Sequence, residues 1–373
     1  MKRICVFCEI WESGGIEAFV SGVLLGMDRT GLEIDVVVTQ RKESVFTAGL
    51  EAAGVRLIEL SGHLYHFRAN YRIFRALLRE NAYDVVHLNA FQGMSLYYLK
   101  IAADMGVPIR IAHSHNTALR KSWLRAGKEL VHRIYRARYA PCATALWACS
   151  RSAGEFLFPA GVVRVQEVSF IPDGIPIERF VRDPAQRQRT RSELGIGASQ
   201  LVIGHVGRLC YQKNQTFLLD VLAAVKRRQP DALLLLVGDG RDRTALERKA
   251  EKLGIGDSVR FYGTSKRVER LLWAMDVFAF PSLFEGFGIA VMEAQAAGLA
   301  VVCSDRVPAE ARVLSTTVTL PLACGAEEWA RQILSAERGA ADRSEAIREA
   351  GFDMADVAAR IESYYRGRDS HDA

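Results

Sequence analysis

Apolar and polar positions follow two alternating patterns along most of the 373-residue chain. In the first half, short apolar and partly β-branched runs predict buried strands at residues 3–8, 34–39, 55–59, 85–89 and 109–113. Amphipathic segments lie between these runs and predict helices, for example at residues 16–27 and 71–81. Strands that alternate with helices indicate a parallel sheet with helices on both faces.

The second half repeats this alternation, with predicted strands at residues 201–206, 233–237, 259–262, 277–281 and 300–303. A turn-rich stretch and a charged segment separate the two halves. We therefore predict an α/β protein with two doubly wound, Rossmann-like domains that face each other across a cleft. The predicted domains are residues 1–180 and residues 181–351. Residues 352–373 are interpreted as a C-terminal helix that crosses back to the first domain.

Composition and charge narrow the classes of partner. Apolar residues make up 49% of the chain, which is enough for two cores, and the net charge of +6 is too small to predict a nucleic-acid partner. Basic residues gather in residues 120–138, interleaved with Trp123, Leu124 and Tyr135. Two interpretations stay open for this stretch: a helix that lies on an anionic membrane surface, and a solvated helix beside the cleft.

The sequence also bears on location and on metals. It has no apolar run of the roughly 20 residues that a membrane span needs. Its seven cysteines are an odd number and lack the second pair of a zinc site, so we expect reduced thiols and predict no metal centre. These features predict a cytoplasmic protein, with peripheral contact to the inner face of the plasma membrane as the alternative.

A glycine-containing loop and the helix after it carry the strongest chemical pattern. Gly286 and Gly288 precede a predicted helix, where backbone N–H groups can approach phosphate or sugar oxygens. Glu293 is the one carboxylate among small and apolar residues of that helix, and a buried carboxylate needs hydrogen-bond donors such as a ribose diol. Glu285, at the mouth of the loop, is expected to reach hydroxyls beyond the phosphates. The alternative is that both are ordinary surface carboxylates.

Two cations follow the first predicted strand of the second domain. Arg208 ends the run at residues 203–208, and Lys213 lies in the loop before the next helix. An arginine fork and a lysine at the carboxyl end of a strand can bind a diphosphate and neutralise it as a leaving group. A salt-bridged loop is the alternative.

Several motifs in order resemble the retaining family 4 (group 1) glycosyltransferases, including those that make capsules and exopolysaccharides. They are residues 206–208, 213–214, 237–240 and 259–263, followed by Glu285 and Glu293. The resemblance implies a GT-B fold, a donor bound mainly by the second domain, and retention of the anomeric configuration. By this match Arg208 and Lys213 bind the donor diphosphate, and Glu293 binds the ribose. Glu285 and the amides of Phe287 and Gly288 bind the sugar or its phosphate, and Gly238 and Gly240 belong to the donor site.

The first domain carries weaker signals of the same kind. Gly14 and Gly15 resemble the glycine loop of the family near the donor phosphates, although a tight turn before a helix explains them equally well. His115 aligns with the histidine of the family that lies near the donor sugar. His113 and Asn116 resemble the subset that acts on capsule or exopolysaccharide acceptors. For both histidines, a structural role is the alternative.

These expectations define a function. The resemblance implies a hexosyltransferase that needs no cofactor beyond a nucleotide-sugar co-substrate, with UDP-sugars favoured and GDP-mannose as the alternative. The acceptor is expected to be a glycan or lipid-linked molecule of the bacterial cell surface, and His115, Arg208, Lys213 and Glu285 are the predicted catalytic residues. Two rival hypotheses are a nucleotide-sugar epimerase or hydrolase on the same fold, and a catalytically silent subunit that binds sugar nucleotides.

Overall fold

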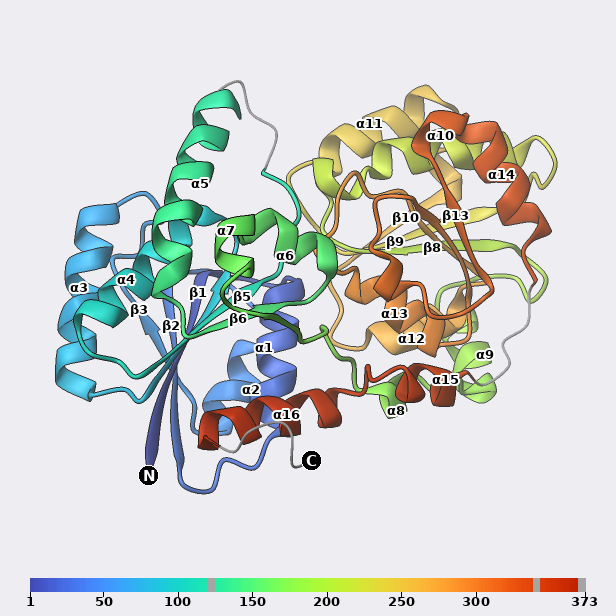
Figure 1. Cartoon of the computed structure of the whole chain (residues 1–373). Coiled ribbons are helices and arrows are strands. Elements are labelled where there is room, and N and C mark those ends of the chain that lie inside the picture. Colours follow the sequence, from blue (N-terminus) through green and yellow to red (C-terminus); the bar gives the residue numbers. More distant parts are fainter. Residues whose placement is uncertain (120–124, 338–342, 368–373) are drawn as a thin grey trace. The chain divides into compact units, whose positions relative to one another are not determined.

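The chain forms two compact units in a computed structural model that describes residues 1–119, 125–337 and 343–367 (Figure 1). Unit 1 comprises Met1–Gly174 together with the chain from Met354 onward, and unit 2 comprises Ile175–Asp353. Each unit is an α/β structure around one sheet in which all paired strands are parallel. The predicted fold class, two doubly wound Rossmann-like domains, is confirmed.

The sheet of unit 1 has seven strands in the order β3-β2-β1-β4-β5-β6-β7. They are β1 (Lys2–Trp11), β2 (Leu32–Arg41), β3 (Arg56–Glu59), β4 (Val85–Ala90), β5 (Ile109–Ser114), β6 (Ala145–Ala148) and β7 (Val168–Phe170). The chain winds outward from β1 to β3 and then returns to place β4 on the other side of β1. The loops after β1 and β4 therefore diverge at a topological switch point, where α/β sheets bind ligands.

Eight α-helices accompany this sheet in the described part of unit 1. They are α1 (Gly15–Gly26), α2 (Thr47–Ala52), α3 (Phe67–Asn81), α4 (Tyr97–Asp104), α5 (Arg125–Tyr139), α6 (Arg151–Leu157), α7 (Ala160–Val163) and α16 (Met354–Arg366). Helices α3, α4 and α5 pack in sequence beside one another, and α16 packs against α1. The C-terminal helix thus lies on unit 1.

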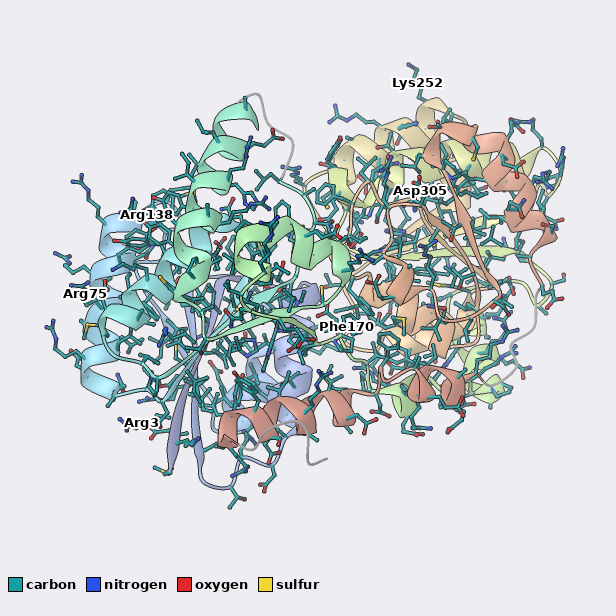
Figure 2. The ribbon with its side chains drawn as sticks, viewed as in Figure 1. Arg3, Arg75, Arg138, Phe170, Lys252 and Asp305 are labelled. Atoms are coloured by element: carbon teal, nitrogen blue, oxygen red, sulfur yellow. The ribbon has the colours of Figure 1, made fainter. Side chains whose placement is uncertain are left out.

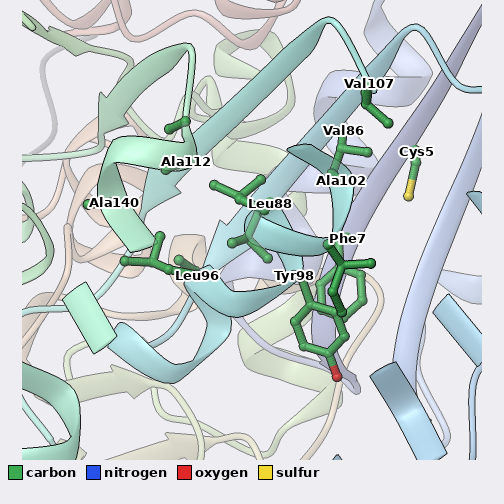
Figure 3. Packing of buried hydrophobic residues seen from close by; sticks show 14 of the residues in the cluster. Cys5, Phe7, Val86, Leu88, Leu96, Tyr98, Ala102, Val107, Ala112 and Ala140 are labelled. Carbon is green, nitrogen blue, oxygen red and sulfur yellow. The ribbon is translucent and has the colours of Figure 1, made fainter. Parts of the chain in front are cut away.

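The core of unit 1 lies between its central strands and helices α3 and α4 (Figure 3). Phe7 on β1 is fully buried, with its ring centroid 4.1 Å from that of Tyr98 and 5.4 Å from that of Phe74. Both faces of the central strands are covered, and their residues are apolar almost throughout. This burial explains the continuous apolar runs, and it holds the strand ends that carry polar side chains in fixed positions.

The sheet of unit 2 has six strands in the order β10-β9-β8-β11-β12-β13. They are β8 (Val202–Val206), β9 (Leu233–Val237), β10 (Val259–Gly263), β11 (Val277–Phe280), β12 (Ala300–Ser304) and β13 (Thr317–Leu320). The α-helices described in unit 2 are α8 (Ile177–Phe180), α9 (Pro184–Glu193), α10 (Gln215–Lys226), α11 (Arg243–Lys252), α12 (Val268–Ala274), α13 (Ile289–Ala296), α14 (Gly325–Ser335) and α15 (Ser344–Glu349). The switch point lies between β8 and β11.

The charged segment at residues 182–191 largely falls in α9. Arg187 and Arg191 of this helix bind opposite oxygens of Asp276, at 2.6 and 3.3 Å. Asp276 also accepts a hydrogen bond from the backbone N–H of Val202, so this network fixes α9 beside the first strand of unit 2. The charges therefore have a packing role within unit 2.

Three short strands, β6, β7 and β13, are absent from the prediction. β6 is four residues long and half alanine, a residue that is depleted in strands, and β7 has only three residues. No described helix is long and apolar enough to cross a membrane. All seven cysteines are free thiols, and Cys5, Cys8, Cys149 and Cys303 are buried.

Candidate functional site

Two loops of unit 2 meet where the strand order reverses. The loop after β8 carries Lys213, and the loop after β11 carries Glu285. Backbone and side-chain hydrogen bonds join the loops: the N–H of Leu283 donates to the carbonyl of Gln212 at 2.8 Å, and the Asn214 amide donates to the carbonyl of Pro281 at 3.2 Å. Residues that lie some 70 positions apart in the sequence are thereby brought into one site.

Lys213 and Glu285 form an ion pair at the centre of this site. The Lys213 Nζ lies 2.7 Å from Glu285 Oε1, and it also lies 4.7 Å from the ring centroid of Phe280. The Glu285 side chain is only 6% exposed, so it is a buried, paired carboxylate and lies deeper than the loop mouth where we expected it. Gln212 approaches its other oxygen at 3.4 Å. The lysine charge is held on a fixed carboxylate, and Arg208, earlier on the same loop, is exposed.

Gly238 and Gly240 have a packing role that the sequence did not predict. A Cβ atom on Gly238 would lie 2.2 Å from the carbonyl oxygen of Gly207, and one on Gly240 would lie 2.3 Å from that of Leu209. Only glycine allows the loop after β9 to lie this close to the loop that carries Arg208. The two glycines therefore shape the backbone of the predicted diphosphate loop.

The loop after β11 ends at Gly288, which is the N-cap of α13. Gly288 has φ +105°, a conformation that side chains with a Cβ rarely adopt, and this turn leads directly into the first helical residues. Phe287 is 2% exposed and packs against Phe352 at a centroid distance of 5.5 Å. The buried ring anchors the turn, so that the N-terminus of α13 is held rigidly.

Glu293 lies one turn into α13 and is the most unusual carboxylate of unit 2. Within the described residues its side chain makes no hydrogen bond and no ion pair. Burial raises its pKa to about 7, with a further rise from Glu269 and an opposing effect from Arg179. Arg179 is itself engaged by Glu269, at 2.8 Å. A carboxylate that is desolvated and left without donors favours a ligand with hydroxyl groups to donate.

In unit 1, His115 follows β5 and is held from both sides. Its Nδ1 lies 3.0 Å from Asp173 Oδ1, and its Nε2 lies 2.9 Å from Asn89 Oδ1. The imidazole is 1% exposed, and the ring of Phe19 packs on it at 5.0 Å. This histidine is therefore fixed in one orientation.

The contacts of Asn89 assign the protons of His115. Asn89 Nδ2 donates to the carbonyl of Phe7 at 3.4 Å, which directs Oδ1 toward the imidazole. An amide oxygen can only accept, so Nε2 carries a proton, and Nδ1 faces a carboxylate. Asp173 and Asn89 together hold the ring through its two nitrogens.

His113 lies deeper, inside the sheet. It is fully buried, and its Nε2 donates to the carbonyl of Ile171 at 3.3 Å. Its Nδ1 accepts from His87 Nε2 at 3.2 Å, and His87 Nδ1 accepts from the hydroxyl of Tyr365, on α16, at 2.6 Å. Burial and the neighbouring His115 lower the pKa of His87 to about 3 and that of His113 well below its usual value. Both are neutral links of a buried chain, and His113 has no exposed surface for a ligand.

The other residues predicted in the first domain lie at its strand ends. Gly14 is the N-cap of α1 and Gly15 its first residue. Asn116 is partly exposed, and its amide joins two loops by donating to the carbonyls of Phe91 and Ala118, at 3.2 and 2.8 Å. These residues belong to the loops around the switch point of unit 1.

Only part of the basic stretch at residues 120–138 can be described. Arg120, Lys121, Trp123 and Leu124 lie outside the described residues. Helix α5 carries the remainder, and Lys128, Arg133 and Arg138 are exposed on it. Leu130 and Ile134 are also exposed, by 59% and 52%. Apolar and basic side chains thus share the surface of this helix.

One cluster has the composition of a metal site. His115, Cys149 and Asp173 place one ligand atom each within 4.8 Å of one another, and the described residues contain no second group of this kind. Two of these atoms, on His115 and Asp173, already face each other at hydrogen-bond distance. The cluster is accounted for by the histidine–aspartate pair.

Asn89, Asp173 and Tyr365 were not predicted as partners of the histidines. Asn89 was counted as the last residue of a strand, and Asp173 as part of a turn. Two signals were available. One is a polar residue at the end of an apolar strand, and the other is an acidic residue in a turn that contains glycine and two prolines. Neither residue type reveals by itself that His115 is its partner.

Comparison with known proteins identifies the family of this chain. Residues 14–174 match the family model described as a glycosyl transferase 4-like domain, and residues 186–354 match that of the glycosyl transferases of group 1. A Bacillus subtilis protein named as a glycosyltransferase, EpsF, is 30% identical over 93% of this chain and 91% of its own length. An Escherichia coli UDP-Gal:α-D-GlcNAc-diphosphoundecaprenol α-1,3-galactosyltransferase is 28% identical over 61% of this chain and 59% of its own length.

Solved structures show the same fold. HepE of Anabaena, crystallised with UDP and glucose, superimposes with a TM-score of 0.73 at 19% identity and covers 99% of this chain and 95% of its own. Sucrose-phosphate synthase of Thermosynechococcus elongatus has a TM-score of 0.75 at 18% identity, covering 98% and 99%. These neighbours have the GT-B fold that the sequence resemblance implied. The chain belongs to the group 1 glycosyltransferases and is a transferase enzyme that uses nucleotide-sugar donors.

Proposed function

We propose that this protein is a retaining glycosyltransferase that moves a hexose-type sugar from a nucleotide diphosphate to a lipid-linked or polysaccharide acceptor in bacterial cell-surface glycan synthesis. The observation that carries the proposal is the carboxylate of Glu293. It is half-buried, burial raises its pKa to about 7, and no described residue donates to it. A ribose diol would supply the missing donors, as it does for acidic residues of dinucleotide-binding folds.

The diphosphate and the sugar of the donor can be assigned to other residues of the same unit. The rigid turn at Gly288 directs backbone N–H groups of α13 toward an anion, and Lys213 offers a cation at the same switch point. Arg208, earlier on the same loop, would bind the diphosphate with Lys213. A UDP-sugar is the favoured donor, since HepE was crystallised with UDP-glucose and the E. coli relative is named for UDP-galactose. GDP-mannose is the alternative, since relatives named as GDP-mannose-dependent mannosyltransferases match part of the chain.

The proposed reaction proceeds on one face of the sugar. The bond between the anomeric carbon and the diphosphate oxygen breaks, and the acceptor oxygen bonds to the anomeric carbon from the same side. The leaving diphosphate takes the acceptor proton, and Lys213 and Arg208 stabilise its developing charge. His115 would act as a positioning residue of unit 1, because both of its ring nitrogens already bind side chains of that unit. No step needs a cofactor.

The acceptor and the location rest on weaker support. The E. coli relative is named for a diphosphoundecaprenol acceptor, which is lipid-linked. On α5, exposed Leu130 and Ile134 lie among exposed basic side chains, a composition that suits an anionic membrane surface. We therefore propose a cytoplasmic protein that acts at the inner face of the plasma membrane, with Asn116 at the strand ends on the acceptor side.

Acceptor-dependent release of nucleotide tests the proposal. A thermal-shift screen over UDP-sugars and GDP-mannose first identifies the donor, because a ligand at 100 times its dissociation constant adds about 2.7 kcal/mol of stability. With that donor, we expect nucleotide release to require a lipid-linked acceptor and the product to keep the anomeric configuration by NMR. Release without an acceptor would indicate a hydrolase, conversion of the donor sugar an epimerase, and binding without turnover a silent subunit.

The pairing of His115 with Asp173 leads to a separate prediction. Asp173→Asn keeps a hydrogen-bond acceptor but removes the carboxylate that orients the His115 ring through Nδ1, so we expect kcat to fall roughly tenfold to a hundredfold. Donor affinity, which depends on unit 2, should change little. Steady-state kinetics and a thermal-shift titration with donor measure the two effects. Asp104→Asn, which removes a carboxylate from a surface ion pair of the same unit, is the control, and an equal loss in both variants would contradict the role of Asp173.

A further inference from the structure

Two buried polar side chains, His205 and Gln215, contact the loop that carries Arg208 and Lys213, and the proposed function does not use them. Polar side chains of unit 2 commonly project into solvent, as the exposed Lys252 of α11 does (Figure 2). His205, on β8, is fully buried, and Gln215, the first residue of α10, is 1% exposed. Burial of an imidazole and an amide is costly unless their polar atoms find partners, so their contacts indicate what they do.

His205 is fixed in one neutral form. Its Nδ1 lies 3.0 Å from the carbonyl oxygen of Ala279 on β11, the strand next to β8. A carbonyl oxygen only accepts, so Nδ1 carries the proton and Nε2 is left as an acceptor. Burial lowers the pKa of His205 to about 4; the bond to Ala279 opposes this shift, and the charge of Lys213 adds to it. The imidazole therefore stays uncharged at neutral pH.

The acceptor nitrogen of His205 orients the amide of Gln215. Gln215 Nε2 lies 3.1 Å from His205 Nε2 and donates to it. The second proton of the same amide nitrogen goes to the carbonyl of Arg208, at 2.9 Å. The amide oxygen accepts from the backbone N–H of Cys210, at 3.4 Å. One side chain thus binds the backbone of the loop on both sides of the buried Leu209.

His205 also lies close to the side chain of Lys213. A Cβ atom on Gly207 would lie 3.3 Å from His205 Nε2 and 3.3 Å from Lys213 Cε, so the imidazole and the lysine stem both approach this glycine. The ring of Phe280 stacks on the imidazole at a centroid distance of 5.4 Å, and the same ring lies 4.7 Å from Lys213 Nζ. The imidazole therefore supports the aromatic ring that contacts the lysine charge.

We propose that His205 and Gln215 are positioning residues for sugar transfer, which hold residues 207–213 so that Arg208 and Lys213 meet the donor diphosphate together. This inference rests on the proposed function of that loop. Arg208 lies at the surface, where water can satisfy backbone groups, so the fold does not require a buried amide there. Two apolar residues would fill the same space at little cost in stability. What the imidazole–amide pair adds is a fixed loop geometry, which transition-state stabilisation requires.

Gln215→Leu tests the contact with the loop, because leucine fills similar space but cannot bind the Arg208 carbonyl or the Cys210 N–H. We expect kcat to fall on the order of thirtyfold, since a small displacement of catalytic groups is costly. Calorimetric titration with UDP and UMP gives a second readout. The affinity for UDP should fall several-fold more than that for UMP, which lacks the second phosphate. A merely structural role would lower the melting temperature and leave the ratio of the two affinities unchanged.

Two variants of His205 test the bond to Gln215 independently of Gln215→Leu. His205→Gln can place an amide oxygen near the position of Nε2 and so keep an acceptor for Gln215, whereas His205→Asn can keep the donor to Ala279 but is too short to reach Gln215. We expect kcat of His205→Gln to stay within about fivefold of normal and that of His205→Asn to fall at least about tenfold. Equal turnover of the two variants would overturn the role of this bond.

The matched control is Asn70→Leu, which removes a fully buried amide from unit 1. Asn70 likewise fixes a loop, by accepting from the hydroxyl of Ser61 at 2.6 Å and donating to the carbonyl of His63 at 2.9 Å. Its loss should lower the melting temperature but leave kcat and the ratio of UDP to UMP affinity unchanged. Equal effects of Gln215→Leu and Asn70→Leu on these two quantities would overturn the inference and leave the proposed function intact. Absence of acceptor-dependent transfer by the unaltered protein would instead overturn the proposed function.

Discussion

Lys213→Ala is expected to lower the turnover of sugar transfer on the order of a thousandfold, the cost of losing a preorganised charge at a leaving group. Lys213 Nζ is held at the switch point by Glu285, 2.7 Å away, and by the ring of Phe280. It needs little reorganisation when a diphosphate departs. Initial rates of acceptor-dependent nucleotide release measure the effect, and we expect a larger fall in kcat than rise in KM.

A purely structural role for this lysine predicts a different pattern. Removal of Lys213 takes away the cation that neutralises the buried Glu285, which destabilises unit 2 as well. The double variant Lys213→Ala/Glu285→Gln removes the stranded charge, so it should recover much of the melting temperature. Recovery of turnover along with stability would show that the pair serves the fold alone.

The matched control for this experiment is Lys249→Ala. Lys249 also binds a carboxylate in unit 2, with its Nζ 2.6 Å from Asp220 Oδ2, but it lies on α11 away from the switch point. Its loss should leave transfer within a fewfold of normal, because exposed ion pairs contribute about 1 kcal/mol or less. A comparable loss of turnover in both variants would contradict a special role for Lys213.

The Lys213–Glu285 pair also marks the limit of what the sequence could predict. Apolar periodicity predicted both loops at strand ends, because buried parallel strands leave clear apolar runs. The contact itself depends on β8 lying next to β11, which reverses the strand order. Alternation along the chain carries no information on that pairing, so the sequence placed Glu285 at the loop mouth when it is in fact buried.

The histidine cluster of unit 1 illustrates the same limit. His115 was recognised because polar residues are conspicuous at the end of an apolar strand. Its partners were not, since Asp173 comes from the segment that leaves unit 1 and Asn89 from a neighbouring strand. Short strands such as β6 were missed because four residues with two alanines give too weak a pattern. Local sequence predicted elements and strand ends, and long-range pairing decided which side chains meet.

Glu293→Gln is expected to weaken donor binding at least a hundredfold at pH 8, since it removes the charge from hydrogen bonds worth about 1.5–3 kcal/mol each. The measurement is a titration with the donor by calorimetry or thermal shift. Glu310→Gln, which alters a carboxylate outside α13, is the control and should bind the donor normally. Equal affinity of Glu293→Gln and the unaltered protein would exclude Glu293 from the donor site.

The pH dependence of the same titration tests whether the charge of Glu293 is the cause of the donor affinity. The donor hydroxyls favour the ionised carboxylate, whose pKa in the free protein is raised to about 7. Below that pH the carboxyl must lose its proton before it binds the diol, so affinity should fall roughly tenfold between pH 8 and pH 6. In Glu293→Gln this dependence should disappear. A slope that persists in the variant would assign the titration to another group.

Stability should change in the opposite direction to affinity. Because the folded-state pKa of Glu293 lies above its ordinary value of 4.5, the folded protein holds the proton more tightly, and stability from this group is present below pH 4.5 and lost as pH rises toward 7. Glutamine carries no charge to desolvate. Above pH 7 the free energy of unfolding of Glu293→Gln should therefore exceed that of the unaltered protein by on the order of 2–3 kcal/mol. Urea unfolding at pH 5 and pH 8 measures the difference. A residue that destabilises the free protein, but is stabilised when a donor binds, is positioned for that donor. If Glu293 were a structural carboxylate, its substitution would lower the free energy of unfolding at both pH values.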